Sequence, residues 1–333
     1  MDNNIILKNA ILHILDTNIN LPVLSNTEMQ LNPDLNKFII SHINRLLKSD
    51  NYKKCIFKDN SPLLDKIKSF TNTYDNNNFI NLSKEIANNF FTIMLRNLKI
   101  PSADLIISII NINEIDYLAI IKLNYRNSFI HLVQNKEGLT NNTIIKQLTA
   151  LPSDISKLEE AVLIDLNNLN IKLLEKVYKI DGSKDYYISA YILRCTDNIS
   201  DKNKLKTILK TAYDINQKYY NNDKNHESEV NVAIANGIYD KKEVLIEDLC
   251  KDIYIDSPEI KTEFFEILNN NKINKNENLD LSEISLKKFE KQYIKTSNGI
   301  EVKIPISLYN DYDKIEFINN PNGTISLLIK NIY

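Results

Sequence analysis

The chain is poor in the residues on which several large enzyme classes depend. It has 333 residues but only 5 glycines, 3 methionines and no tryptophan. Phosphate-binding loops need glycine because their backbone approaches the phosphate closely and takes positive φ angles. The sequence contains no P-loop, no dinucleotide fingerprint, no nucleophile elbow and no paired-histidine zinc motif. No local motif therefore indicates catalysis, and we predict a protein that is not an enzyme and has no cofactor.

Cysteine is equally scarce. Cys55, Cys195 and Cys250 lie far apart in the sequence and are odd in number. Disulfide frameworks and zinc knuckles need cysteines in pairs, often at short spacings. We therefore expect a reducing compartment, no disulfide framework and no zinc site.

Long hydrophobic runs are missing as well. No apolar run approaches the ~20 residues that a membrane-spanning helix needs. The first apolar stretch is broken by Lys8, Asn9 and His13, unlike the apolar core of a signal peptide. We predict a soluble, cytoplasmic protein without a membrane partner.

The chain also lacks an excess of positive charge. Its 41 basic and 43 acidic residues give a net charge of -2 and a pI near 6.2. Proteins that grip nucleic acid over a large surface are usually basic, because each neutralised phosphate releases counterions. Any contact with nucleic acid must therefore come from a local cluster of cations.

Apolar periodicity predicts an α+β protein. Alternating residues predict strands in the first 30 residues, an antiparallel meander over 104–135, and strands at 143–150, 161–166 and 185–194. Asn32-Pro33 has the form of a helix start. Helical spacing follows it, and further helices are predicted at 78–98, 202–220, 227–236 and 241–253, with another beginning at Ser257.

The change of period near residue 200 predicts the domain organisation. We expect a mixed N-terminal domain with an antiparallel sheet at 1–198, a helical region at 199–273 and a small C-terminal β unit at 280–333. The polar run 269–278 reads as a linker, followed by a short helix at 284–293. Two asparagine- and glycine-containing turns then separate strands at 300–306, 315–318 and 324–332.

Two lysine clusters are candidates for phosphate contacts. On the predicted helix 202–220 an apolar face opposes a row of cations, as expected of a helix that docks by one side and exposes the other. The second cluster lies at the end of the first helix and has Asp50 as its only acid. A solvated surface would show the same patterns, so both interpretations stay open. The candidate DNA-binding residues are Lys202, Lys206, Lys210, Lys218, Arg45, Lys48, Lys53, Lys54 and Lys58.

Two carboxylate groups are candidates for a metal site. Acid pairs can bind Mg²⁺ for phosphodiester hydrolysis. One group is Glu159, Glu160 and Asp165, but neighbours in an extended chain point to opposite faces. The second group, Glu243, Glu247, Asp248 and Asp252, has the spacing of a solvated helix face. His13 and His42 lie on apolar faces, which favours buried, hydrogen-bonded histidines over ligands.

Several segments follow one another in an order and spacing that carry information on family: Ala10-Ile11-Leu12-His13-Ile14-Leu15-Asp16, Pro101-Ser102-Ala103-Asp104-Leu105, Ile121-Lys122-Leu123-Asn124-Tyr125, Leu151-Pro152, and Lys157-Leu158-Glu159-Glu160-Ala161-Val162-Leu163-Ile164-Asp165. In the order and spacing of these segments, the chain resembles the NdpA/YejK-type bacterial nucleoid-associated proteins. The resemblance covers residues 5–190 best and 284–330 more weakly. It implies a nucleoid-localised protein that associates with duplex DNA and with DNA-topology enzymes, and it assigns no catalytic residue and no DNA-binding surface.

We therefore predict a non-enzymatic nucleoid-associated protein that binds duplex DNA through lysine clusters with weak sequence preference. A second copy of the chain is a further candidate partner. The near-neutral charge keeps open a different class, an adaptor recruited to the nucleoid by another DNA-bound protein. A metal-dependent phosphodiesterase is the third hypothesis.

Overall fold

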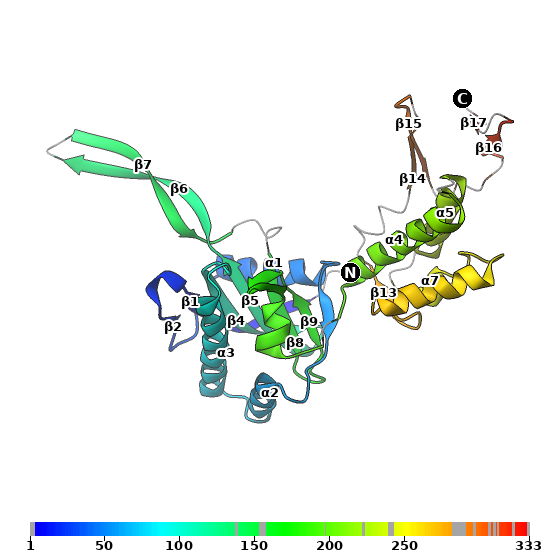
Figure 1. Ribbon diagram of the computed structural model, residues 1–333. Helices are drawn as coiled ribbons and strands as arrows, with labels where there is room; N and C mark the ends of the chain where they lie inside the picture. Colours follow the sequence, from blue (N-terminus) through cyan, green and yellow to red (C-terminus); the bar gives the residue numbers. More distant parts are fainter. Residues whose placement is uncertain are drawn as a thin grey trace. The chain divides into compact units, whose positions relative to one another are not determined.

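The computed structural model describes two compact units, Met1–Asn198 and Ile199–Tyr333 (Figure 1). Both contain helices and antiparallel strands, so the predicted α+β class is confirmed. The predicted separation of a C-terminal β unit at residue 280 stays a prediction. The residues described are 4–136, 139–152, 158–196, 198–221, 224–238, 243–281, 291–295, 298–305, 308, 311, 313–321 and 324–331.

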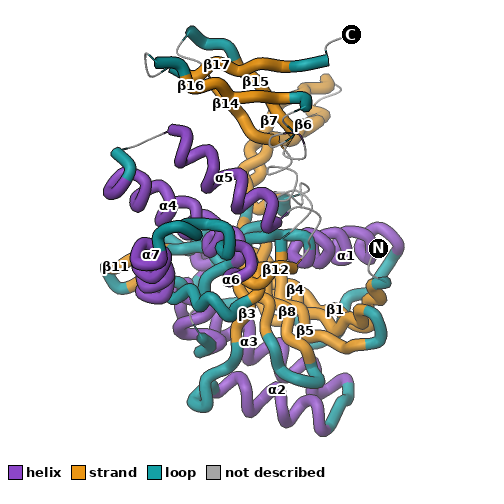
Figure 2. Tube along the Cα trace, turned by 90° about the vertical axis from the view of Figure 1, so that its right-hand side faces the viewer, coloured by secondary structure: helices purple, strands orange, loops and turns teal. Residues whose placement is uncertain are grey.

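A seven-stranded antiparallel sheet forms the centre of the first unit (Figure 2). Its strand order is β2-β1-β4-β5-β8-β9-β3. The hairpin between β4 and β5 turns at Asn113 and Glu114, which both have positive φ, as a two-residue turn that matches the strand twist requires. The strands are β1 (Ile5–Leu15), β2 (Val23–Leu24), β3 (Lys53–Cys55), β4 (Ala103–Ile112), β5 (Ile115–Asn124), β8 (Glu160–Asp165) and β9 (Ile171–Leu174).

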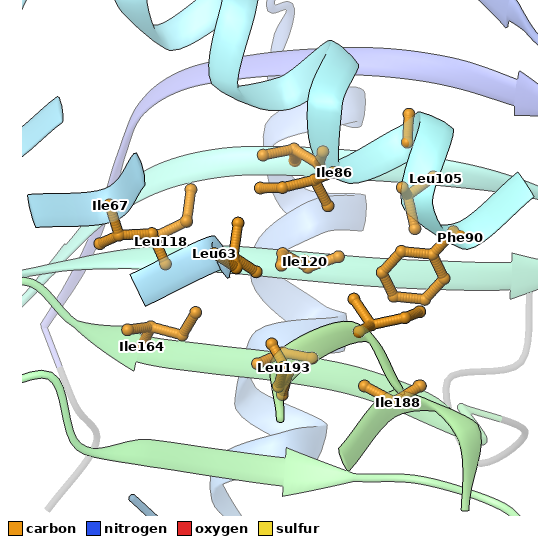
Figure 3. Packing of buried hydrophobic residues seen from close by; sticks show 14 of the residues in the cluster. Leu63, Ile67, Ile86, Phe90, Leu105, Leu118, Ile120, Ile164, Ile188 and Leu193 are labelled. Carbon is orange, nitrogen blue, oxygen red and sulfur yellow. The ribbon is translucent and has the colours of Figure 1, made fainter. Parts of the chain in front are cut away.

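Helices cover both faces of this sheet, which explains why its strands read as continuous apolar runs. Successive residues of β4 alternate between two cores: Ile106 and Ile110 pack in the cluster of α1, whereas Ile107 packs in the cluster of α2 and α3. Figure 3 shows this second cluster, in which Leu63, Ile86 and Phe90 meet the sheet. The helices are α1 (Pro33–Leu47), α2 (Pro62–Asn72), α3 (Asn76–Arg96) and a π-helix (Ile188–Leu193), with a 3-10 turn at Thr17–Ile19.

Two further hairpins belong to the first unit. β6 (Arg126–Lys136) and β7 (Leu139–Ala150) pair with each other and project from the sheet as an arm, drawn in green in Figure 1. β10 (Tyr178–Ile180) pairs with β11 (Ser183–Asp185). Within the meander predicted over 104–135, β4 and β5 pair as expected, but β6 pairs with β7 and not with β5, so the prediction of a continuous meander was wrong. β7 contains the strand predicted at 143–150.

The second unit is built on a helical core. Apolar residues of α4 (Asp201–Tyr219), α5 (Lys224–Ile238) and α7 (Pro258–Asn270) pack with those of α6 (Ile246–Leu249) and of a two-stranded sheet. That sheet pairs β12 (Glu243–Leu245) with β13 (Asn278–Asp280). The remaining described strands form the hairpins β14 (Lys291–Lys295) with β15 (Glu301–Pro305) and β16 (Ile315–Asn319) with β17 (Ile325–Ile329).

Four other local predictions were wrong or incomplete. The strand predicted at 185–194 is mostly the π-helix. Its helical turn allows Tyr187, Ile188 and Ile192 to be buried together in the core that contains α3. The helix predicted at 241–253 is interrupted, since Val244 pairs with Leu279 in a sheet. The predicted linker 269–278 ends in that same sheet. Residues 284–290 of the predicted short helix lie outside the described residues, and 291–295 form a strand.

His13 is buried inside the first unit, as predicted, and its hydrogen bonds fix its neutral form. The backbone N–H of Ser25 donates to its Nδ1, so the proton sits on Nε2, which lies 3.0 Å from the Ser83 hydroxyl. Burial, helped by the Lys84 charge, lowers the pKa of His13 to about 4. The imidazole must therefore stay neutral for the unit to keep this packing.

Acid should destabilise the protein through His13. In the unfolded chain its pKa is about 6.5, so between pH 6.5 and pH 4 the unfolded state binds a proton that the folded state excludes. Between pH 7 and pH 5 the free energy of unfolding of the wild type should fall by about 2 kcal/mol more than that of the His13→Gln variant. Urea unfolding at both pH values measures this difference. An identical pH dependence in the variant would contradict this assignment.

Candidate nucleic-acid interface

The helix α4 places its apolar side in the core and its lysines in solvent. Leu205, Ile208 and Ile215 are buried in the core of the second unit, as the helical wheel predicts. The same wheel places Tyr219 on the apolar side, and here the prediction was wrong, because Tyr219 is 44% exposed at the end of the helix. The side chains of Lys202, Lys206, Lys210 and Lys218 are exposed.

These four lysines differ in their surroundings. Lys218 forms an ion pair of 2.7 Å with Glu263 of α7, and that hydrogen bond raises the pKa of Lys218. Its charge is therefore balanced locally. Lys202, Lys206 and Lys210 make no ion pair with any residue that the structure describes. We call these three lysines the α4 row.

One further lysine of α4 is structural. Lys204 is half-buried and its Nζ lies 2.5 Å from Glu277 Oε2 and 3.6 Å from Asp201 Oδ1. Asp201 in turn accepts a hydrogen bond from the backbone N–H of Asp280. These contacts tie the first turn of α4 to β13, so the helix that carries the α4 row is anchored at its start.

Lys53 of the second cluster is buried, unlike the lysines on either side of it. It lies on β3 with 7% of its surface exposed, and its Nζ is 3.0 Å from Glu175 Oε1 and 3.4 Å from the centre of the Tyr186 ring. The sequence pattern shows neither β3 nor this pairing. Lys53 therefore serves the packing of the sheet edge, and it is removed from the candidate surface.

The rest of the second cluster stays at the surface. Lys48, Lys54 and Lys58 are exposed, and Arg45 is half-buried in the last turn of α1. Lys54 lies on β3, with its side chain alternating away from that of Lys53. These four residues remain a prediction for phosphate contact.

The carboxylates near residue 160 bind lysines within the fold. Glu160 lies across from Lys122 in the β5–β8 register, and their charged groups are 2.7 Å apart with both side chains almost fully buried. Burial lowers the pKa of Lys122, and the Glu160 charge opposes that shift. The adjacent Glu159 pairs with Lys176 at 2.9 Å, and its second carboxylate oxygen accepts a hydrogen bond from the Asn124 amide, which also donates to Glu160.

Asp165 lies at the opposite end of β8 and does not join them. It accepts hydrogen bonds from the backbone N–H groups of Asn167 and Asn168 and so stabilises the turn to β9. In the second carboxylate group, Glu247 pairs with Lys275 and Glu243 accepts from Asn278. Across the described residues, no three His, Cys, Asp or Glu side chains are placed to hold a metal ion.

Membrane insertion receives no support from the helices. None of those described combines the length and apolar composition that a bilayer crossing requires.

Comparison with known protein families identifies one match. The family model described as nucleoid-associated protein YejK matches residues 11–333, which is nearly the whole chain. No curated protein matches the sequence.

Proposed function

Because the chain belongs to the family of the nucleoid-associated protein YejK, we propose that it binds duplex DNA directly. The resemblance read from the sequence is confirmed, and with it the general role of a bacterial nucleoid-associated protein. The mode of binding is the proposal: contacts from lysine side chains to the phosphate backbone, with weak sequence preference and no chemical reaction on the DNA.

The observation that supports this proposal best is the α4 row. Its three lysines are four residues apart on one helix, so consecutive side chains are separated by about 6 Å at a rise of 1.5 Å per residue. That step is comparable with the separation of consecutive phosphates on one strand. Lysine contacts of this kind hold a protein on the duplex without reading the bases.

Charge balance supports a local contact over a whole-surface one. The chain is slightly acidic overall, so an extended surface would repel phosphates. On α4 the exposed acid is Asp214, because Asp201 is buried. The row thus offers three positive charges in no described ion pair, and Asp214 follows Lys210 one turn later on a protein whose net charge is near zero.

The absence of catalysis is part of the same proposal. A phosphodiesterase needs carboxylates that converge on a metal ion. Here Glu160 faces Lys122, Glu159 faces Lys176 and Asp165 holds a turn. Association with DNA-topology enzymes remains a prediction from the family resemblance.

Titration of a labelled random-sequence duplex with the purified full chain tests direct binding. We expect binding at about 50 mM salt and displacement by unrelated duplexes of equal length, because phosphate contacts carry no sequence information. Absence of binding under these conditions would favour the adaptor hypothesis, in which another DNA-bound protein recruits this one.

A further inference from the structure

The arm formed by β6 and β7 is exposed over most of its described length. Its strands pair from Arg126 with Ala150 to Lys136 with Leu139, and in the described part of the chain they pair with no other strand. Figure 1 shows the arm extending away from the seven-stranded sheet. Both outer edges of the arm therefore present unpaired backbone N–H and C=O groups.

Large apolar side chains are exposed along this arm. Phe129 and Ile144 are each 71% exposed, which is unusual for residues of this size in strands. Since side chains alternate between the two faces of a strand, Phe129, Val133 and Ile144 share one face of the hairpin, and Ile130 and Ile145 share the other. The exposed apolar residues of the arm are Phe129, Ile130, Val133, Ile144, Ile145 and Leu148.

Such an arm is expected to be covered by a partner. An isolated two-stranded hairpin is only marginally stable in water. Open strand edges and contiguous apolar surface promote association. Neither of the cores that pack against the sheet includes a residue of β6 or β7.

We propose that the arm is a dimerisation element that packs against the arm of a second copy of this chain. The six exposed apolar side chains present on the order of 600 Å² per copy over the two faces of the hairpin, so two arms that wrap around each other and cover both faces would bury about 1,200 Å² in total, the lower end of stable interfaces. This inference does not depend on the proposed DNA contact of α4.

The distribution of charge along the arm favours a second copy. The middle of the arm, residues 130–133 paired with 142–145, contains no Lys, Arg, Asp or Glu. Its cations lie toward the ends, with Arg126 and Lys146 nearer the base and Lys136 near the tip. In a two-fold contact the middle of each arm meets the middle of the other, because such interfaces are self-complementary. Antiparallel arms would then keep their two Lys136 residues far apart.

The same distribution argues against a duplex as the partner of this segment. Nucleic-acid contacts draw on cations at the contact surface, and the middle of the arm contains no lysine or arginine. A dimer would also present two α4 rows, so two weak phosphate contacts could act together on one DNA molecule.

Analytical ultracentrifugation of the full chain, from about 1 µM to about 100 µM, tests the proposal. We expect a monomer–dimer equilibrium for the wild type. Changing Phe129→Asp and Ile144→Asp together should weaken dimerisation at least a hundredfold, because both charges would be buried in the contact. The matched control changes Leu21→Asp and Leu98→Asp, which are 72% and 71% exposed away from the arm and should leave dimerisation unchanged.

A cross-linking variant gives an independent result on a chain whose apolar surface is intact. The three native cysteines are buried, so Thr143→Cys adds a single exposed thiol at the middle of the arm. A short bis-maleimide should then link two copies, whereas Leu98→Cys should not be linked. A wild type that stays monomeric would overturn the proposal, as would equal effects of the arm and control variants. If the wild type is monomeric and the arm variant loses DNA binding, the arm contacts DNA and the proposal is wrong.

Discussion

Changing Lys202, Lys206 and Lys210 together to glutamate should weaken duplex binding by about a hundred- to a thousandfold, or about 2.7–4.1 kcal/mol. Each lysine–phosphate contact releases about 0.9 counterion, and this release favours binding at low salt. The loss of three such contacts accounts for the expected decrease in affinity. Reversal of charge adds repulsion. The measurement is the titration of a labelled duplex at about 50 mM salt, compared with the wild type.

The fold should tolerate this triple change. All three side chains are exposed and make no described ion pair, while the opposite side of α4 holds Leu205 and Ile208 in the core. We therefore expect the free energy of unfolding to stay within about 0.5 kcal/mol of the wild-type value.

A matched control separates a local contact from bulk electrostatics. Changing Lys68, Lys99 and Lys179 to glutamate alters the net charge equally at exposed positions of the other unit. If this control weakened binding as much as the α4 variant, the α4 row would have no special role. A third variant, with Lys48, Lys54 and Lys58 changed to glutamate, tests the cluster after α1 in the same titration.

Changing Lys122→Met should cost about 3–5 kcal/mol of stability, the largest single-residue effect that we expect. The substitution leaves the Glu160 carboxylate fully buried without its ionic partner. Asn124 and the Tyr178 hydroxyl still donate to Glu160, but neither carries a charge. Chemical denaturation of the full chain measures the effect.

Two comparisons make this prediction specific. The double change Lys122→Met and Glu160→Met should recover at least half of the loss, since an apolar pair avoids burying a lone charge. Lys8→Met, which breaks the exposed pair of Lys8 with Asp116, should cost less than about 1 kcal/mol. A cost for Lys122→Met as small as that for Lys8→Met would show that Glu160 is neutral or solvated.

The elements that could be predicted from sequence are those with a long local period. The helices α1, α3, α4 and α7 each bury one stripe of residues, and the strands β4 and β5 are continuous apolar runs because both faces are covered. Short elements formed by distant pairing could not be predicted. β3 has only three residues, Lys53–Cys55, and exists because it pairs with β9. β12 likewise depends on β13.

The same distinction holds for the candidate site. The exposed lysine side of α4 follows from its helical period and was predicted. The burial of Lys53 was not, since its partner Glu175 is 122 residues away in the chain. The exposure of Phe129 and Ile144 was also unforeseen, because an apolar residue in a strand pattern says nothing about whether a neighbouring layer covers it.

The dependence of duplex affinity on salt concentration tests direct DNA binding most directly. If the α4 row contacts phosphates, the logarithm of the association constant should fall with the logarithm of salt concentration at a slope of about −3 or steeper. The slope should become shallower by about 2.7 in the variant with Lys202, Lys206 and Lys210 changed to glutamate. A wild-type protein that leaves the duplex unbound at about 50 mM salt, or an affinity that does not change with salt, would contradict direct binding through lysines.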